Sequence, residues 1–170
     1  MNAELFALRV IHVYGAVVWA GTSLFVSFFL IPAIGMAGPA GGPVMGALVK
    51  RKLFTIVPIV AVVTMLTGLR MMWLASKGIS AAYFSSTLGQ TYSIGATFAL
   101  ATFVVFMAVN HPAIGRMLAL GQQIAAAREA ERPPLMEQLN AVRARAATAS
   151  KVNALFISIT IVAMALGRYM

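Results

Sequence analysis

Long runs of apolar residues alternate with short polar stretches along this chain of 170 residues. Four of these runs are long enough to cross about 30 Å of hydrocarbon as helices that rise about 1.5 Å per residue. They extend from about Leu5 to Pro32, Leu53 to Ala75, Thr91 to Asn110 and Val152 to Tyr169. The pattern therefore predicts an all-α integral membrane protein, an up-down four-helix bundle that forms a single membrane domain over residues 1–170.

The composition agrees with a membrane protein. Hydrophobic residues make up 61% and charged residues 10% of the chain, and the mean hydropathy is +0.88. So few charges cannot cover a water-facing surface. The chain has no cysteine, which excludes disulfides, thiolate metal sites and cysteine nucleophiles. The net charge of +9 does not indicate nucleic acid, because the basic residues cluster beside apolar runs, where anionic lipid headgroups bind them.

Lysine and arginine are divided unevenly between the two ends of the predicted spans. Nine follow spans 1 and 3, namely Lys50, Arg51, Lys52, Arg116, Arg128, Arg132, Arg143, Arg145 and Lys151. Four lie at the opposite ends, namely Arg9, Arg70, Lys77 and Arg168. The side richer in positive charge is usually cytoplasmic. We therefore expect a multi-pass protein of the bacterial inner membrane with both termini on the periplasmic side.

The segment from about 115 to 150 is the one sizeable polar part of the chain. Residues 126–131 favour helix, and Pro133-Pro134 is expected to break it. Leu135, Leu139 and Val142 then recur at helical spacing and form one apolar stripe. We predict a cytoplasmic helical hairpin that extends spans 3 and 4, with the stripe packed inside it. The alternative is that the stripe binds a partner or the membrane surface.

The tetrapeptide PAIG occurs at residues 32–35 and again at residues 112–115, an offset of 80. At the same offset Gly15 aligns with Gly95 and Thr22 with Thr102. Spans 2 and 4 also begin alike, as LFTIVPIVA and LFISITIVA. This ordered set of matches favours a tandem repeat of a two-span unit, with the halves parallel about an axis along the membrane normal.

His12 is a candidate ligand within span 1, about 10 Å from its outer end. An ionisable group inside a span usually faces the bundle interior and has a partner. Trp19 lies two turns further on the same face, and Gly15 between them leaves room for a flat ligand or close helix contact. Neutral imidazole binds haem iron, and bundle interiors often hold such cofactors. The alternative is a histidine hydrogen-bonded to a neighbouring span.

Arg70, near the outer end of span 2, is a candidate partner for a haem propionate or another carboxylate. The alternative is that its side chain reaches the lipid headgroups. Together with Arg9 and Arg168 it would form a basic collar above a pocket at His12. At the repeat offset His12 falls opposite Tyr92, so the two halves differ in chemistry there and a site at this level, which could include Tyr92, would be asymmetric.

Other chemistry is less well supported by the sequence. Eleven methionines suggest copper, because thioethers suit Cu(I), but they are scattered and fit a packing role better. His111, at the cytoplasmic end of span 3, is interpreted as an interfacial residue far from His12. The sequence contains no nucleotide-binding loop, Ser-His-Asp set or metalloprotease motif.

The stretch IHVYGAVVWAG, together with TMLTGL in span 2, resembles small bacterial membrane proteins of the copper-resistance protein D and HemJ-type protoporphyrinogen oxidase group. The resemblance covers chiefly spans 1 and 2. For the HemJ-type proteins it implies a haem b bound through a first-helix histidine, here His12. Those proteins also use a lysine in a later span, whereas no predicted span here contains one. Only the fold and His12 are therefore carried over, and whether the chain is an enzyme stays open.

The leading hypothesis is a haem-binding redox or haem-handling subunit. His12 would be an axial ligand, Arg70 an anion partner, and Trp19, Gly15 and Tyr92 residues of the pocket. One alternative is a cofactor-free structural or assembly subunit of a membrane complex. Another is a copper or small-solute transporter, although the spans lack the carboxylates that proton-coupled transport commonly uses. A membrane partner subunit or a homodimer is compatible with each of these hypotheses.

Overall fold

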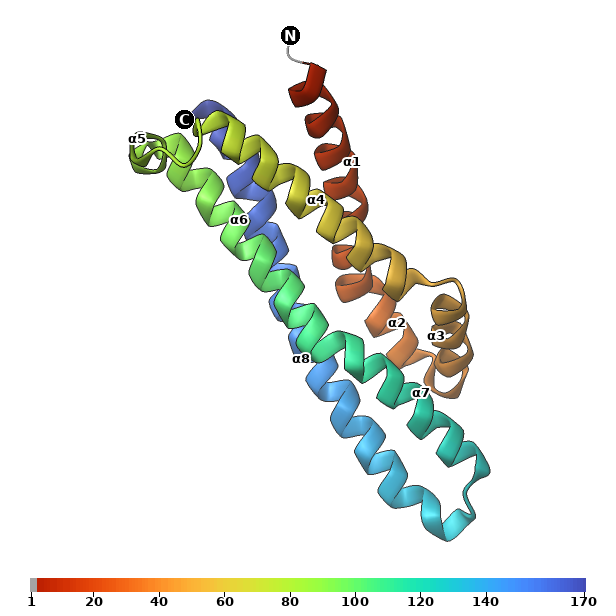
Figure 1. Cartoon of the computed structure of the whole chain (residues 1–170). Helices are drawn as coiled ribbons and strands as arrows, with labels where there is room; N and C mark the ends of the chain where they lie inside the picture. The colour runs from red at the N-terminus through yellow and green to blue at the C-terminus, as the bar shows by residue number, and fades with distance from the viewer. Residues whose placement is uncertain (1–2) are drawn as a thin grey trace.

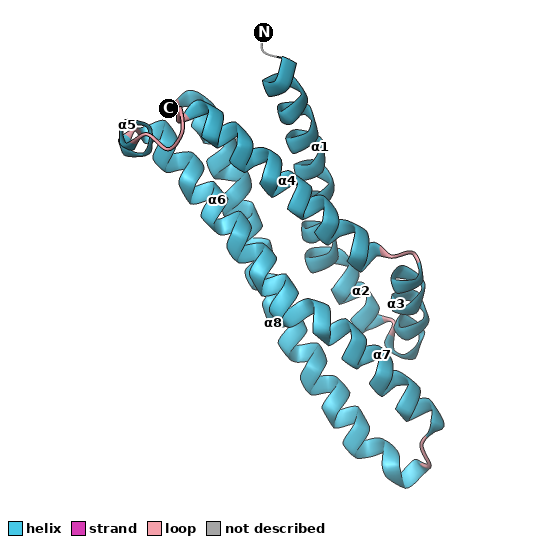
Figure 2. Cartoon of the chain, in the orientation of Figure 1, coloured by secondary structure: helices cyan, strands magenta, loops and turns pink. Residues whose placement is uncertain are grey.

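The computed structural model describes residues 3–170, which are helical apart from short turns and contain no strand (Figures 1 and 2). Four of its helical stretches are long and apolar enough to cross a membrane. The predicted all-α fold with four spanning helices is therefore confirmed at the level of length and composition. In chain order the elements are α1 (Ala3–Phe25), η1 (Val26–Leu30), α2 (Ile31–Met36), η2 (Gly38–Ala40), α3 (Gly41–Lys50), α4 (Leu53–Ala75), α5 (Ala81–Ser85), α6 (Thr87–Val105), η3 (Phe106–Asn110), α7 (His111–Ala126), η4 (Glu129–Glu131), α8 (Arg132–Leu166) and η5 (Gly167–Tyr169).

The second span has the predicted bounds, whereas the helical stretches that contain the first, third and fourth spans are longer than the predicted spans. The third begins at Thr87 because the Ser86 hydroxyl caps α6 by accepting a hydrogen bond from the Gly89 N–H at 3.1 Å. The first span continues as a helix through Pro32, where it was expected to end, and the third continues through Pro112, two residues beyond its expected end.

Two π-helical segments let the chain pass these prolines. Proline has no N–H to donate, and its ring clashes with the carbonyl four residues earlier. Just before Pro32 the Ile31 N–H bonds to the Val26 carbonyl, and just before Pro112 the His111 N–H bonds to the Phe106 carbonyl. Each bond spans five residues, so one extra residue is accommodated and the helix continues at a bend.

The connection between α7 and α8 differs from the prediction. The helix ends at Ala126, and Ala127 and Arg128 are extended, so residues 126–131 do not form the α-helix expected there. Pro133 and Pro134 do not break a helix; they lie in the first turn of α8. Proline is favoured there because the N–H groups of a first turn have no partner within the helix.

The spans form two antiparallel pairs, α1 with α4 and α6 with α8 (Figure 1). The pairs meet through contacts of α1 and η1 with α8 and of α4 with α6. Both chain ends lie at one end of the molecule, here named the terminal end, and the α7–α8 turn lies at the other, the hairpin end (Figure 1). Toward the terminal end α1 diverges from the rest of the bundle (Figure 1).

Small residues make up most of the core where the pairs meet. Trp19, Ala20, Ala61, Ala99 and Ile157 form the buried cluster. Alanine at a crossing lets helix backbones approach closely, which is how helices pack in lipid. In contrast, many large apolar side chains on the outer faces are exposed, as expected for surfaces that contact lipid. Between α7 and α8, Leu139 is buried and Leu135 and Val142 are half-buried, which fits packing of the predicted stripe within the hairpin.

Candidate functional site

His12 lies at the contact between α1 and α4, in the half of the bundle toward the terminal end. Its Nδ1 is 2.8 Å from the backbone carbonyl oxygen of Thr64 and 3.5 Å from the Thr67 hydroxyl. A carbonyl oxygen only accepts hydrogen bonds, so Nδ1 carries the proton in the neutral ring. The other nitrogen, Nε2, then keeps its lone pair, and no hydrogen bond to it occurs within residues 3–170.

Two glycines allow this arrangement. A Cβ at Gly68 would lie 2.7 Å from the Cε1 atom of His12, so the imidazole rests directly on the α4 backbone. A Cβ at Gly15 would collide with the Thr64 hydroxyl, whose own hydrogen bond to the Val60 carbonyl holds it in place. The glycines therefore bring α1 and α4 together and fix the orientation of the ring.

Arg70 is bound to a carboxylate of the chain itself. Its guanidinium forms an ion pair with Glu4 at 2.7 Å, and both side chains are about half exposed. Glu4 lies one residue outside the span expected from the sequence, so its contribution was missed there. Arg70 joins the terminal ends of α1 and α4, and a propionate would have to compete with Glu4 for it.

The other residues predicted for the site lie apart from His12. Trp19 is buried in the core cluster and lines an inner cavity two turns further toward the hairpin end. Tyr92, on α6, packs against Gly167 where α8 ends. It also neighbours Tyr83, where burial and then the nearby Tyr92 phenol raise the pKa of Tyr83 above its ordinary value. The structure thus brings together His12 and Gly15 but not Trp19 or Tyr92.

His111 lies in the hairpin half of the bundle, at the junction of η3 and α7, and is exposed beside the Phe106 ring. The described part of the chain contains no group of three or more His, Asp or Glu side chains that could hold a metal ion. A metal held by three or more such side chains therefore has no site among the described residues. A haem differs in this respect, because the porphyrin supplies four nitrogen ligands and the protein need supply only an axial one.

An inner cavity of about 430 Å³ lies among the four spans at the level of the two π-helical segments. Its walls are mainly apolar, and several hydroxyl and carboxamide groups line them as well. Buried Asn110 joins η3 to α8: its Nδ2 donates to the Ala146 carbonyl at 3.1 Å and to the Ser150 hydroxyl at 2.9 Å, and its Oδ1 accepts from the Asn153 Nδ2 at 3.1 Å.

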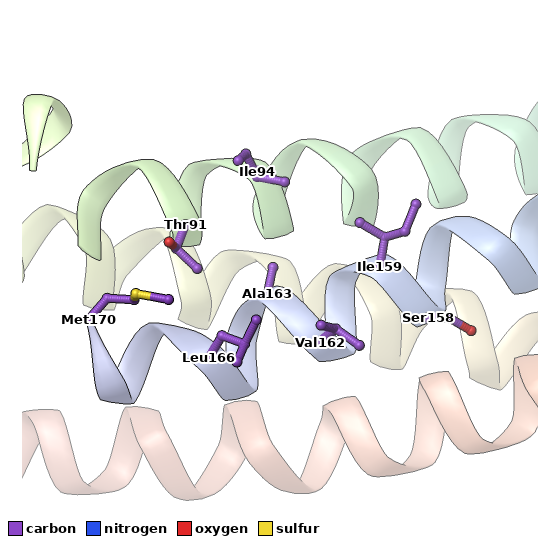
Figure 3. Close-up of a pocket in the computed structure, with 8 residues that line it drawn as sticks. All are labelled: Thr91, Ile94, Ser158, Ile159, Val162, Ala163, Leu166 and Met170. Atoms are coloured by element: carbon purple, nitrogen blue, oxygen red, sulfur yellow. The ribbon is translucent and has the colours of Figure 1, made fainter. Parts of the chain in front are cut away.

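A second hollow, of about 440 Å³, lies between α6 and α8 toward the terminal end (Figure 3). It is lined by Thr91 and Ile94 of α6 and by side chains between Ser158 and Met170. The hydroxyls of Thr91 and Ser158 donate to carbonyls of their own helices. This hollow therefore offers a ligand an apolar surface and no unpaired hydroxyl.

Some site residues were missed by the sequence analysis. Thr64 and Gly68 are the partners of His12, and both lie in the TMLTGL stretch that carries the resemblance in span 2. The spacing of Thr64, Thr67 and Gly68 along one helix face is the signal that would have found them. Asn153 gave no such signal, because an asparagine near the start of an apolar run also fits a helix end.

Comparison of the chain with protein-family models, curated proteins and solved structures finds no match.

Proposed function

We propose that this protein is a haem-binding integral membrane protein, a redox or haem-handling subunit, with His12 Nε2 as an axial ligand. The observation that carries the proposal is the 2.8 Å hydrogen bond from His12 Nδ1 to the Thr64 carbonyl. Histidines that ligate metals usually donate their other ring N–H to a carbonyl or carboxylate, which fixes the tautomer and raises the basicity of the ligating nitrogen.

The residues around His12 support one axial contact. Gly68 leaves no side chain beneath the imidazole, and the Thr64 carbonyl orients it. A haem bound there would supply one-electron redox chemistry. The chain's own contribution is to keep the proton of the neutral ring on Nδ1, through the Thr64 carbonyl, and to fix the orientation of the ring so that Nε2 can face the iron.

Two finer features of the architecture belong to the same proposal. The π-helical segments occupy residues 26–30 and 106–110, the offset of 80 that separates the PAIG copies, and this supports a duplicated two-span unit. The hairpin end, with nine lysines and arginines beside it, is proposed to face the cytoplasm, with both termini on the periplasmic side.

The experiment is a visible spectrum of the protein purified from membranes, oxidised and then reduced with dithionite. We expect a Soret band that disappears in His12→Ala and stays in the matched variant His111→Ala, which removes the exposed histidine in the other half. Circular dichroism establishes that each variant is folded. A folded wild-type protein that stays colourless after haem supplementation would instead favour the cofactor-free assembly role. A Soret band that persists in His12→Ala would exclude His12 as the ligand.

A further inference from the structure

The inner cavity has the properties of a ligand site. Its volume of about 430 Å³ falls in the range of small-molecule pockets, which are mostly apolar with a few converging polar groups. Aromatic rings from three spans line it, among them Trp19, Phe54 and Phe103. Both π-helical segments contribute to its wall, through Val26 and Ser27 and through Phe106 and Asn110. Such segments often mark functional sites, because they shift side chains out of ordinary helical register.

Two hydroxyls in its wall are unpaired. Within the apolar parts of the described spans, serine and threonine hydroxyls generally donate to a carbonyl of their own helix, as Thr64, Thr102 and Ser158 do. Thr22 and Ser23 lie well inside span 1 and line the cavity, yet their hydroxyls have no partner within residues 3–170. An unpaired hydroxyl is costly where no water reaches it, so these two groups are suited to a bound molecule.

A carboxamide oxygen in the wall is unpaired as well. Asn110 Nδ2 faces the Ala146 carbonyl, which fixes the orientation of that amide and points its Oδ1 to Asn153. Asn153 must then present its Nδ2 to Asn110, which leaves its Oδ1 over. That oxygen is the one buried side-chain polar atom without a partner in the described range, and the residue is 5% exposed. It can only accept, so its missing partner is a donor.

The three unpaired groups lie at a similar depth. The Ser27 hydroxyl donates to the Ser150 carbonyl at 3.1 Å, so Ser27 of η1 and Ser150 of α8 lie at the same depth in the bundle. Because the two helices run antiparallel, both residues lie on the terminal-end side of this contact. Ser23 is about one helical turn from it along span 1, and Asn153 is slightly less than one turn from it along α8. A single small molecule can therefore contact both neighbouring walls.

The charge of the wall limits what can bind. Arg143 is the one charged residue that lines the cavity, and it is exposed on the part of α8 that extends toward the hairpin end. The level of Thr22, Ser23 and Asn153 has no charged side chain in the lining, so a charged ligand group there would be desolvated without a counter-ion. The ligand part that binds at this level is therefore neutral.

We propose that the inner cavity binds a neutral, membrane-soluble molecule of the hydroquinone class. One ring hydroxyl donates to Asn153 Oδ1, the ring lies against the aromatic wall, and the Thr22 and Ser23 hydroxyls contact the second oxygen. An acyl chain would leave all three polar groups unpaired. This binding does not depend on the haem proposal, because none of its residues contacts His12.

The test uses the full chain in lipid nanodiscs and two probes: decylubiquinol and its dimethyl ether, which has the same ring and tail but no hydroxyl donor. The chain contains two tryptophans, and Trp73→Phe leaves Trp19 in the cavity wall as the one tryptophan reporter. Empty nanodiscs correct for partition into lipid. We expect saturable changes in Trp19 emission and an affinity about tenfold higher for decylubiquinol than for the ether, the effect of about one buried hydrogen bond.

Matched variants locate the binding. Asn153→Leu is expected to lower decylubiquinol affinity about tenfold and to leave ether affinity unchanged, because the ether has no hydroxyl to donate to Asn153 Oδ1. Thr22→Val is expected to lower decylubiquinol affinity as well, because it removes a hydroxyl that contacts the second oxygen. Thr102→Val is the control, because Thr102 lines the same cavity but its hydroxyl already donates to the Phe98 carbonyl. Thermal unfolding of each variant verifies that it is folded. Equal affinity for both probes, no saturable response of Trp19, or an equal loss in Thr102→Val would each overturn the proposal. Repeating the titration with His12→Ala separates its outcome from that of haem binding.

Discussion

Two glycines at the contact between α1 and α4 determine how closely His12 approaches its neighbour. The imidazole lies over Gly68, and Thr64 lies against Gly15. In a helix interior glycine is less favourable than alanine by about 1 kcal/mol. At these two positions that cost is offset by a backbone approach that no larger residue permits.

Gly68→Ala is expected to destabilise the protein and to weaken any cofactor bound through His12. The new methyl would lie 2.7 Å from His12 Cε1, so the ring must move away from the Thr64 carbonyl. Thermal unfolding should show a lower midpoint and the Soret absorbance should fall. Gly21→Ala on α1 is the control, since nothing lies within 4 Å of a Cβ there. It should leave the midpoint unchanged or raise it. A Gly68→Ala protein as stable as Gly21→Ala would contradict the packing described.

The sequence identified His12 as a residue in need of a partner, and the structure supplies one. The identity of the partner was not predictable, because it is a backbone carbonyl and every residue has one. The Glu4–Arg70 pair was missed for a different reason. The start of span 1 was predicted at the first apolar residue, Leu5, which left the charged Glu4 one residue outside the span. The helix itself begins at Ala3 and includes Glu4.

At the scale of the elements, η3 and α8 are joined by a buried polar contact. Asn110 makes three hydrogen bonds to α8, and together they compensate for burying its own carboxamide in an apolar setting. The adjacent π-helical segment ends at Asn110 itself. The bend before Pro112 and the attachment to α8 therefore occur at the same place.

Asn110→Leu is expected to lower the free energy of unfolding by about 2–3 kcal/mol, because it leaves the buried Asn153 Nδ2 without an acceptor. The double variant Asn110→Leu/Asn153→Leu should recover part of this loss, since no carboxamide then stays unpaired. Unfolding in mixed detergent micelles measures both values. Asn140→Ala, at an exposed site on α8, the helix that contains Asn153, provides the reference. Losses that simply add in the double variant would show that the two side chains are not coupled.

Element boundaries were predicted well where a simple signal was present and poorly at prolines. The second span was correct at both ends. Pro32 was taken as the end of span 1, but a helix can continue past proline when it widens by one residue. Pro133-Pro134 was taken as a break, although the same residues are favoured in a first turn. The presence of proline alone does not distinguish these outcomes. They depend on whether the residues before the proline form a widened helical turn, as before Pro32, or an extended segment and a short 3-10 turn, as before α8.

At the scale of the whole molecule, the four spans and their up-down order followed from apolar length alone. Which faces of the helices meet did not, because in a span apolar residues surround the whole helix and periodicity gives little direction. The inner cavity likewise has no sequence signal, since its wall draws on residues from all four spans.

The orientation predicted from lysine and arginine can be tested because the chain has no native cysteine. Single cysteines at Met170→Cys, on the terminal end, and Glu137→Cys, on the α7–α8 hairpin, both lie at exposed positions. In intact cells a membrane-impermeant thiol reagent should label the first and leave the second unlabelled until the membrane is permeabilised. Labelling of Glu137→Cys in intact cells, with Met170→Cys protected, would reverse the proposed topology.

The pairing of α1 with α4 and of α6 with α8 has a consequence for synthesis on the ribosome. Each pair consists of spans that are neighbours in sequence, so its contacts need only a short loop to close. The first pair is complete once Ala75 has emerged, before any of α6 has emerged. We therefore expect the first hairpin to insert and pack on its own, with His12 already against Thr64. The second hairpin would then dock on it, and the cavity would form last.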